Sequence, residues 1–328
     1  MTTEVDLIKE AVAGDRDSQF ALARKYRDGD GVAVDTKKAI KWFNSASENG
    51  HIRAKYELAL LLFKNGNKNE KTKAIALMEE AAKKGDRDAM MYLARAYRDG
   101  TSVGKDAKKS IAMYKKAMSN GSIQAKLELA EALYKSEDPA DRSMSVIYCY
   151  ELVTGESEDK NAMFRLYLQY RYGVGTKVDS EIAYMWLKRA SEQGHGGAAK
   201  EIKDYHVSAT AKDPNGEMMF RLARKMKEEG SVNDAIGLYR KAVDMGFSRA
   251  KPELAELLYR SDDPMDRLES VRLGYESAVM GDKDGMFRLY LQYQYGVGVK
   301  KNPPVSEMWL KKAADAGHGT ASKLVRNG

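Results

Sequence analysis

The sequence has few of the residues on which several classes of protein depend. Of its 328 residues, one is cysteine, four are histidine and six are proline. The single cysteine, Cys149, cannot form an intramolecular disulfide, which favours a reducing compartment. Apolar runs such as 58–63 fall far short of the roughly 20 residues that a membrane span needs, and the first residues do not resemble a secretory signal. We therefore expect a cytoplasmic protein without a membrane span.

Charge of one sign is not concentrated anywhere in the chain. The 55 basic residues exceed the 48 acidic ones to give a net charge of +7, but the two kinds are mixed throughout. Proteins that bind nucleic acid usually gather basic residues on one face or in one tail. Nucleic acid is therefore not a favoured partner.

Catalytic and metal-binding motifs are also scarce. His51, His195 and His318 each follow a glycine that closes a repeated unit, so the repeat itself explains their positions. The segment 100–105 resembles a phosphate-binding loop but is one residue short, and Asp106 replaces the Ser or Thr that such a loop needs. The sequence predicts no catalytic residue, metal site or cofactor, and we expect the protein not to be an enzyme.

The chain instead contains repeats of two lengths. The segment 163–170, MFRLYLQY, returns unchanged at 286–293, which indicates two long blocks offset by about 125 residues. Alanines recur within them at intervals of 35 to 37 residues, and a leucine follows four residues after most of these, on the same helical face. These alanines are Ala54, Ala89, Ala125, Ala162 and Ala198.

Each short unit has the signals of two helices joined by a turn. Gly-x-Gly segments end the first helix in several units, and Asp35, Asp106 and Asn302 stand where a residue would cap the second. The sequence thus predicts an all-α protein, an α/α solenoid (superhelix) of about eight helix–turn–helix repeats of about 36 residues each. The predicted pairs begin near Asp17, Arg53, Arg87, Ile123, Asp159, Gly216, Arg249 and Asp284.

The repeat rhythm is interrupted once, between the two long blocks. Residues 203–215 are rich in Ser, Thr, Asp, Pro and Asn and are poor helix material. We expect an N-terminal capping half-repeat at 1–16, a first block at 17–202 and an irregular seam or hinge at 203–215. A second block with its own C-terminal cap would then occupy 216–328.

The unit resembles a known repeat family. Residues 21–32, ALARKYRDGDGV, followed by KAIKW at 38–42, are similar to the Sel1-like repeat, a relative of the tetratricopeptide repeat. The resemblance implies a scaffold or adaptor that assembles other proteins. Two departures are Tyr167 and Tyr290, which stand where a small residue is usual, so that they must widen the helix pair or turn outward.

If tetratricopeptide geometry carries over, one face of the first helices lines an inner groove. Its arginines offer forked donors suited to an acidic or C-terminal carboxylate-bearing segment, and its aromatic residues suit a more apolar element. The candidate partner-binding residues are Arg24, Arg27, Arg53, Tyr56, Arg95, Arg98, Phe164, Leu168, Arg171, Tyr172, Phe287, Leu291 and Tyr295.

Other interpretations of this groove remain open at the level of sequence. The arginines beside Asp28 and Asp99 could form a solvated, self-paired face, and the aromatic residues could belong to the core between repeats. The groove could bind an anionic polymer, such as an acidic polysaccharide or nucleic acid, with a steep dependence on salt. Tyr167 and Tyr290 could mark surfaces of a homodimer.

Overall fold

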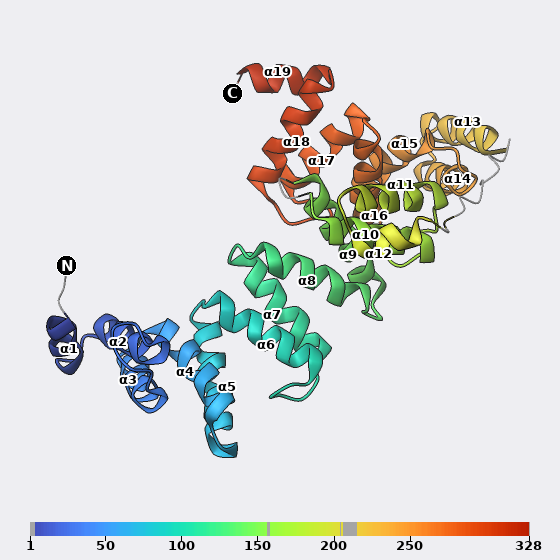
Figure 1. Ribbon diagram of the computed structural model, residues 1–328. Helices are drawn as coiled ribbons and strands as arrows, with labels where there is room; N and C mark the ends of the chain where they lie inside the picture. The colour runs from blue at the N-terminus through green and yellow to red at the C-terminus, as the bar shows by residue number, and fades with distance from the viewer. Residues whose placement is uncertain (1–3, 156–157, 204, 206–214, 328) are drawn as a thin grey trace. The chain divides into compact units, whose positions relative to one another are not determined.

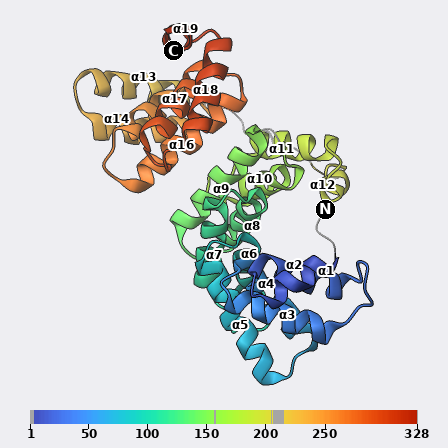
Figure 2. The same cartoon turned by 90° about the vertical axis from the view of Figure 1, so that its left-hand side faces the viewer.

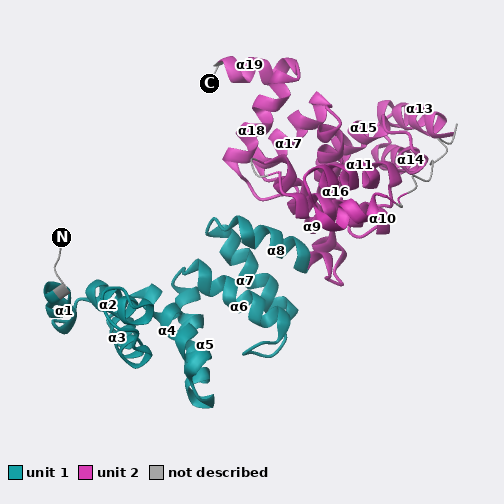
Figure 3. Ribbon diagram, viewed as in Figure 1, with its two compact units in different colours: residues 1–132 teal, residues 133–328 magenta. Residues whose placement is uncertain are grey.

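The computed structural model describes residues 4–155, 158–203, 205 and 215–327, and in this part of the chain every regular element is an α-helix. Contacts divide the chain into two compact units, residues 1–132 and 133–328 (Figure 3). Helix α8 (Ile123–Tyr134) continues from the first unit into the second. The all-α prediction is confirmed.

Unit 1 contains consecutive helical hairpins, each packed on the next (Figure 1 and Figure 2). A short helix, α1 (Glu4–Val12), precedes them. The hairpins are α2 (Arg16–Asp28) with α3 (Thr36–Glu48), α4 (Ile52–Asn65) with α5 (Lys68–Lys83), and α6 (Arg87–Asp99) with α7 (Ala107–Ser119).

Unit 2 continues the same pattern and includes both sides of the predicted seam. In it α9 (Pro139–Thr154) follows α8 in sequence. The hairpins are α10 (Lys160–Tyr172) with α11 (Ser180–Glu192), α13 (Asn215–Glu228) with α14 (Val232–Asp244), α15 (Ala250–Tyr259) with α16 (Pro264–Val279), and α17 (Lys283–Tyr295) with α18 (Pro303–Asp315). The short α12 (Gly196–Glu201) follows α11, and α19 (Gly319–Asn327) follows α18. Both helices of each of the eight predicted pairs are therefore present in the described residues.

The helices begin and end as the sequence signals indicate. Asp35 and Asp106 accept hydrogen bonds from backbone N–H groups three residues later, both at 2.9 Å, and Asn302 does so at 3.4 Å. Such caps satisfy N–H groups that have no partner inside the helix. Gly29 ends α2 with φ +76°, in the left-handed region that favours glycine. The predicted capping roles are confirmed.

Alanine and leucine at the repeat positions form the core of each hairpin. Ala54 and Ala89 are fully buried, as are Leu58 and Leu93 four residues later. A small residue lets the paired helices approach closely, and the leucine fills the space between them. The recurring Ala and Leu pattern therefore specifies the stacking of one hairpin on the next.

Most of the predicted seam, residues 204 and 206–214, lies outside the described residues. The contacts do not divide the chain there but at residue 132, and unit 2 joins the end of the first predicted block to the whole of the second. Helices α9 and α16, which occupy equivalent places in the two blocks, pack against each other.

The contact between α9 and α16 is reciprocal. The rings of Tyr150 and Tyr275, equivalent residues of the two blocks, stack with centroids 5.0 Å apart. The Tyr150 hydroxyl lies 2.9 Å from that of Tyr170, and the Tyr275 hydroxyl 2.8 Å from that of Tyr293. All four tyrosines are buried.

Each block also supplies a glutamate to the other. Tyr170 donates a hydrogen bond to Glu276 at 2.8 Å, and Tyr293 donates one to Glu151 at 2.5 Å. In an isologous dimer, each contact across the interface is repeated by the equivalent residues with the two partners exchanged. The contact between α9 and α16 has this local two-fold symmetry. Unit 2 therefore contains two equivalent helix pairs, α9 with α10 and α16 with α17, that are docked on each other.

Candidate partner-binding surface

The predicted arginines of unit 1 lie on the first helices of successive hairpins, and most are already paired. Arg27 of α2 binds Glu57 of α4 at 2.7 Å, and Arg53 of α4 binds Asp88 of α6 at 2.5 Å. Each pair joins one hairpin to the next. The self-paired face considered above is also present, as Arg27 with Asp28 at 2.6 Å and Arg98 with Asp99 at 2.8 Å.

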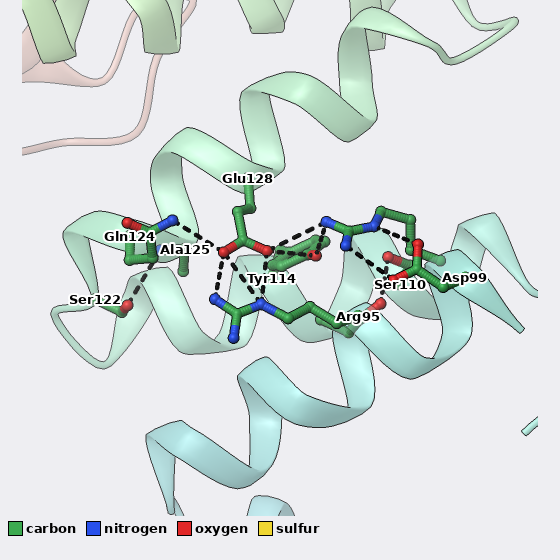
Figure 4. A network of polar contacts seen from close by, with 10 residues as sticks. Arg95, Asp99, Ser110, Tyr114, Ser122, Gln124, Ala125 and Glu128 are labelled. Atoms are coloured by element: carbon green, nitrogen blue, oxygen red, sulfur yellow. Dashed lines mark hydrogen bonds and ion pairs between the residues drawn. The ribbon is translucent and has the colours of Figure 1, made fainter. Parts of the chain in front are cut away.

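The third of these contacts between the first helices of successive hairpins is a network around Glu128 of α8 (Figure 4). Arg95 of α6 binds the Glu128 carboxylate at 2.5 Å, and Arg98 binds it at 3.3 Å. The Tyr114 hydroxyl and the Gln124 amide donate hydrogen bonds to the same carboxylate, at 2.9 and 3.0 Å. Burial alone would raise the pKa of Glu128, but the hydrogen bonds from Arg95, Gln124 and Tyr114 outweigh it and lower that pKa to about 2. The carboxylate therefore stays ionised.

Two unit 1 candidates differ from this pattern. Arg24 is exposed and takes part in none of the ion pairs found among the described residues. Tyr56 is partly buried, with the Arg53 guanidinium 4.3 Å from its ring centroid. Partner binding by either residue stays a prediction.

In unit 2, the two phenylalanines predicted to bind a partner pack between consecutive repeats. Phe164 stacks on His195 with centroids 4.2 Å apart, and Phe287 stacks on His318 at 4.1 Å. Each histidine also accepts a hydrogen bond through Nδ1 from the backbone N–H three residues later, both at 3.1 Å. The structural explanation of these histidines agrees with this geometry. Because one face of each phenylalanine ring is covered by a histidine, only part of the ring is open to a partner.

The most exposed aromatic candidates are the two tyrosines that end α10 and α17. Tyr172 and Tyr295 occupy equivalent positions and are 59% and 58% exposed. The Arg171 guanidinium lies 5.7 Å from the Tyr172 ring centroid and 4.9 Å from that of Tyr205. Leu168 and Leu291, one turn earlier, are partly buried.

One expectation about tyrosine needs correction. Tyr167 neither turns outward nor marks an exposed surface, because its side chain is buried and its hydroxyl donates a hydrogen bond to Glu201. The short helix α12 supplies this carboxylate, and the hydrogen bond satisfies the hydroxyl. Tyr290 is partly buried, with its ring centroid 5.3 Å from that of Phe287.

Sequence reasoning missed the docking residues of α9 and α16. A weak signal was present, since both helices follow a Ser-x-Asp-Pro segment, at 136–139 and 261–264. In each copy the serine hydroxyl donates a hydrogen bond to a carboxylate, Asp141 at 2.9 Å and Asp266 at 2.7 Å. This shared motif distinguishes the two hairpins from the others but does not reveal that they touch.

The described residues hold neither a candidate membrane span nor a candidate metal site. No helix there is both long and apolar enough to cross a membrane. No group of three or more His, Cys, Asp or Glu side chains in the same part of the chain is placed to hold a metal ion.

The stacked hairpins define a helical-repeat solenoid protein. The model of the Sel1 repeat matches six segments, at 16–51, 52–86, 87–122, 161–195, 216–247 and 285–318. These matches cover more than half of the chain, which belongs to the Sel1 repeat family. They leave out two hairpins, α8–α9 and α15–α16, whose second helices are the ones that dock on each other.

Proteins similar to this chain include a bacterial and a yeast protein. An uncharacterized protein of Neisseria meningitidis is 26% identical over 326 residues, covering 97% of this chain and 62% of that protein. Chitin synthase regulatory factor 2 of Schizosaccharomyces pombe is 24% identical over 188 residues, covering 54% of this chain and 37% of that protein. The chain thus spans less than two thirds of the length of either relative.

A solved structure supports the fold. The crystal structure of a Sel1 repeat protein from Oxalobacter formigenes matches with a TM-score of 0.50 at 24% identity, covering 98% of this chain and 90% of that one. Proteins of this family generally mediate protein–protein interaction, and their solenoid is typically a non-catalytic scaffold.

Proposed function

We propose that the chain is a non-enzymatic cytoplasmic scaffold that binds a protein partner along the first helices of its hairpins. We call the predicted residues on α2, α4, α6, α10 and α17 the first-helix surface. The observation that carries the proposal is the exposure of Tyr172 and Tyr295 at equivalent positions. Tyrosine supplies a large, rigid contact with a polar end, and it is enriched at the centres of protein interfaces.

The order of the surrounding side chains supports the same proposal. Arg171 is held against the rings of Tyr172 and Tyr205, and Arg53 against that of Tyr56. Side chains that are ordered before binding lose less conformational entropy when a partner arrives. The name of the yeast relative, a regulatory factor of an enzyme, is also of a kind expected for a protein that acts on another protein.

The ion pairs change which residues we expect to matter most. Arg95 and Arg98 already bind Glu128, so an acidic partner would have to displace an internal carboxylate there. Arg24 makes no ion pair in the described part of the chain, although its charge acts on the Asp28 carboxylate. We therefore assign the larger share of binding to the tyrosines, with Arg24 as the arginine most open to an acidic segment.

The test is a pull-down from native lysate with the full chain as bait, at low and at moderate salt. One variant carries Tyr172→Ala with Tyr295→Ala, and a second carries Arg24→Glu. The matched control carries Met265→Ala with Met280→Ala, two exposed apolar residues of unit 2 outside the first-helix surface. Bound proteins are quantified by mass spectrometry, and circular dichroism confirms that every bait is folded.

We expect a few proteins to survive moderate salt, to be lost with the tyrosine variant and to be retained by the control. Equal retention by both variants and the control would contradict the proposed surface. Material lost altogether at moderate salt would favour the anionic polymer, whose binding releases counterions and falls steeply with salt.

A further inference from the structure

Helix α13, the first helix of the second block, exposes apolar side chains on one face. Met218 and Leu222, which lie one helical turn apart, are 55% and 41% exposed. Met219 beside them is partly buried. Single exposed apolar residues are common on proteins, so the meaning of this pair depends on what the same positions do in other hairpins.

An aromatic contact fixes the register of α13 against the other first helices. Phe220 packs on Tyr239 of α14 with ring centroids 5.7 Å apart, as Phe20 packs on Phe43 of α3 at 5.6 Å. In both first helices the sequence Leu-Ala-Arg begins two residues after the phenylalanine. Leu222 therefore occupies the central leucine position of the repeat.

In six other hairpins this central leucine is buried and a preceding second helix packs on the first helix. The first helices α2, α4, α6, α10, α15 and α17 pack on α1, α3, α5, α9, α14 and α16 respectively. Their central leucines are at most 1% exposed: Leu22, Leu58, Leu93, Leu166, Leu254 and Leu289.

No described helix packs on α13 from this side. In the described part of the chain, α14 is the only helix with more than marginal contact to α13. Leu222 is therefore exposed because the preceding second helix, which covers this position elsewhere, has no counterpart among the described residues. In the first block, the helix at the corresponding place is α5, which packs on α6.

The side chains of this face suit contact with a helix better than contact with water. Where α6 has the fully buried Ala89, α13 has Met218. Methionine adapts its shape to different partners and is common on surfaces that bind helices. The outer face at the end of a solenoid is usually polar, but α13 has Met218 and Leu222 there.

We propose that α13 binds an amphipathic helix of a partner protein, which packs on Met218 and Leu222 as α5 packs on α6. The face continues the interface by which hairpins stack, and a helix fills that interface in six other places. The partner helix should carry an apolar face with small residues, since Met78 and Ala81 of α5 are fully buried. The first-helix surface does not include α13, so this site goes beyond the proposed function and does not depend on it.

The test measures the fluorescence anisotropy of a labelled peptide with the sequence of residues 67–86, which contain α5 with its capping residue and closing turn, titrated with the full chain. The site variant carries Met218→Gln with Leu222→Gln, which keeps the size of the side chains and makes them polar. The matched control carries Met265→Gln with Met280→Gln, exposed apolar residues at the two ends of α16. Circular dichroism confirms that each variant is folded.

We expect the site variant to weaken binding of the α5 peptide about tenfold or more, because apolar contact is lost, while the control changes it less than about twofold. A second peptide with Met78→Gln and Ala81→Gln should bind the unchanged chain about tenfold more weakly than the first. Equal affinity of the site variant and the unchanged chain for the α5 peptide would overturn the site. No binding at chain concentrations up to about 0.5 mM would also overturn it.

Two other occupants of this face give different results. If a second copy of the chain covers α13, sedimentation equilibrium of the chain alone will show a dimer that is lost in the site variant. If residues 206–214 cover it, the α5 peptide will bind only after a Gly–Ser linker of equal length replaces them. Either result would overturn the binding of a partner helix.

Discussion

The two units hold their helices together in different ways. In unit 1, each hairpin packs on its neighbour in sequence, and arginine–carboxylate pairs at the surface join the first helices. In unit 2, hairpins far apart in sequence also dock, through stacked and hydrogen-bonded tyrosines that are fully buried. The same repeat thus supports both stacking along the chain and docking of one block on another.

The two carboxylates at these contacts show the difference most clearly. The Glu128 side chain is 11% exposed, but those of its partners Arg95 and Arg98 are 48% and 36% exposed. Glu276 is almost completely buried with Arg272, Lys251 and Tyr170 around it. Burial raises the pKa of Glu276, but Arg272 and Lys251 outweigh it and hold that pKa far below its usual range.

The family model leaves out α9 and α16, the two helices that pack on each other, although their hydrogen-bond partners Tyr170 and Tyr293 lie in matched segments. The hairpins α8–α9 and α15–α16 lie outside the matched segments, and α9 and α16 are the helices in contact. The Ala and Leu spacing that serves stacking is kept in α8 and α15, as Ala125 with Leu129 and Ala250 with Leu254, whereas the tyrosines and glutamates of α9 and α16 serve docking. Departure from a repeat pattern can therefore mark the place where a solenoid makes an additional contact.

The largest expected effect is the loss of the buried carboxylate of unit 2. Glu276→Ala leaves Arg272 and Lys251 buried without their main partner, and we expect a loss of about 3–5 kcal/mol in the free energy of unfolding. The measurement is urea unfolding followed by tryptophan fluorescence in a Trp42→Phe background, which leaves Trp186 and Trp309 of unit 2 as reporters. A loss below about 1 kcal/mol, the range of surface ion pairs, would contradict the buried network.

The second-largest expected effect is the loss of stability when a glycine of a Gly-x-Gly turn is changed to alanine. Gly298 and Gly31 have φ of +74° and +76°, so alanine at either position is strained by about 1 kcal/mol. A Cβ at Gly298 would also overlap the carbonyl oxygen of Arg267 on α16, while at Gly31 the nearest atom is the Lys25 Nζ at 3.6 Å. We expect Gly298→Ala to lower stability by about 3 kcal/mol or more and Gly31→Ala by about 1. Equal losses in chemical unfolding would show that the turn after α17 does not press on α16.

A smaller expected effect is the dependence of stability on salt concentration. The exposed arginines of the Glu128 network should be screened at high ionic strength, and the buried cluster around Glu276 should not. We expect 0.5 M sodium chloride to reduce the stabilisation by Glu128, about 1 kcal/mol, as measured by comparing Glu128→Gln with the unchanged chain at both salt levels. A salt effect of equal size for Glu276→Gln would remove the distinction between the two networks.

The smallest effect is a dependence on pH that both units share. Burial lowers the pKa of His51 in unit 1 and of His195 in unit 2 below the ordinary value of 6.5. The unfolded chain then binds more protons than the folded one, so stability is fully present above pH 6.5 and is lost as pH falls through that value. The same protonation would remove the Nδ1 acceptor that caps the following helix.

Asparagine offers the control for this prediction, because it caps helices and does not titrate. We expect the double variant His51→Asn with His195→Asn to lose less stability between pH 7.5 and 5.5 than the unchanged chain, measured by thermal unfolding. An unchanged pH slope would contradict the role of these caps.

Much of the fold follows from local sequence signals. The spacing of Ala54, Ala89 and their equivalents, together with capping residues such as Asp35 and Asp106, predicted the hairpins that the structure contains. These signals are readable because each is contained within one repeat. The ion pairs of Arg27 and Arg53 could be considered only as an alternative, since the sequence does not show which acidic residue lies opposite.

The docking of α9 on α16 could not be predicted in the same way. Tyr170 and Glu276 are 106 residues apart, and no periodic pattern links such positions. One sequence difference between the aligned blocks points to this contact, because Arg272 of α16 occupies the position of the apolar Ile147 of α9. A buried arginine on an otherwise apolar face implies a carboxylate nearby, but only the structure shows that Glu276 supplies it.

The central claim is that the two blocks of unit 2 are docked on each other, and a double-mutant cycle tests it most directly. Tyr170→Phe, Glu276→Gln and the double variant are compared by urea unfolding with the tryptophans of unit 2 as reporters. The account predicts a coupling free energy of about 1–3 kcal/mol, because the hydroxyl donates to a buried, charged carboxylate. Single effects that add to within about 0.3 kcal/mol would mean that the two residues do not touch, and would contradict the docking.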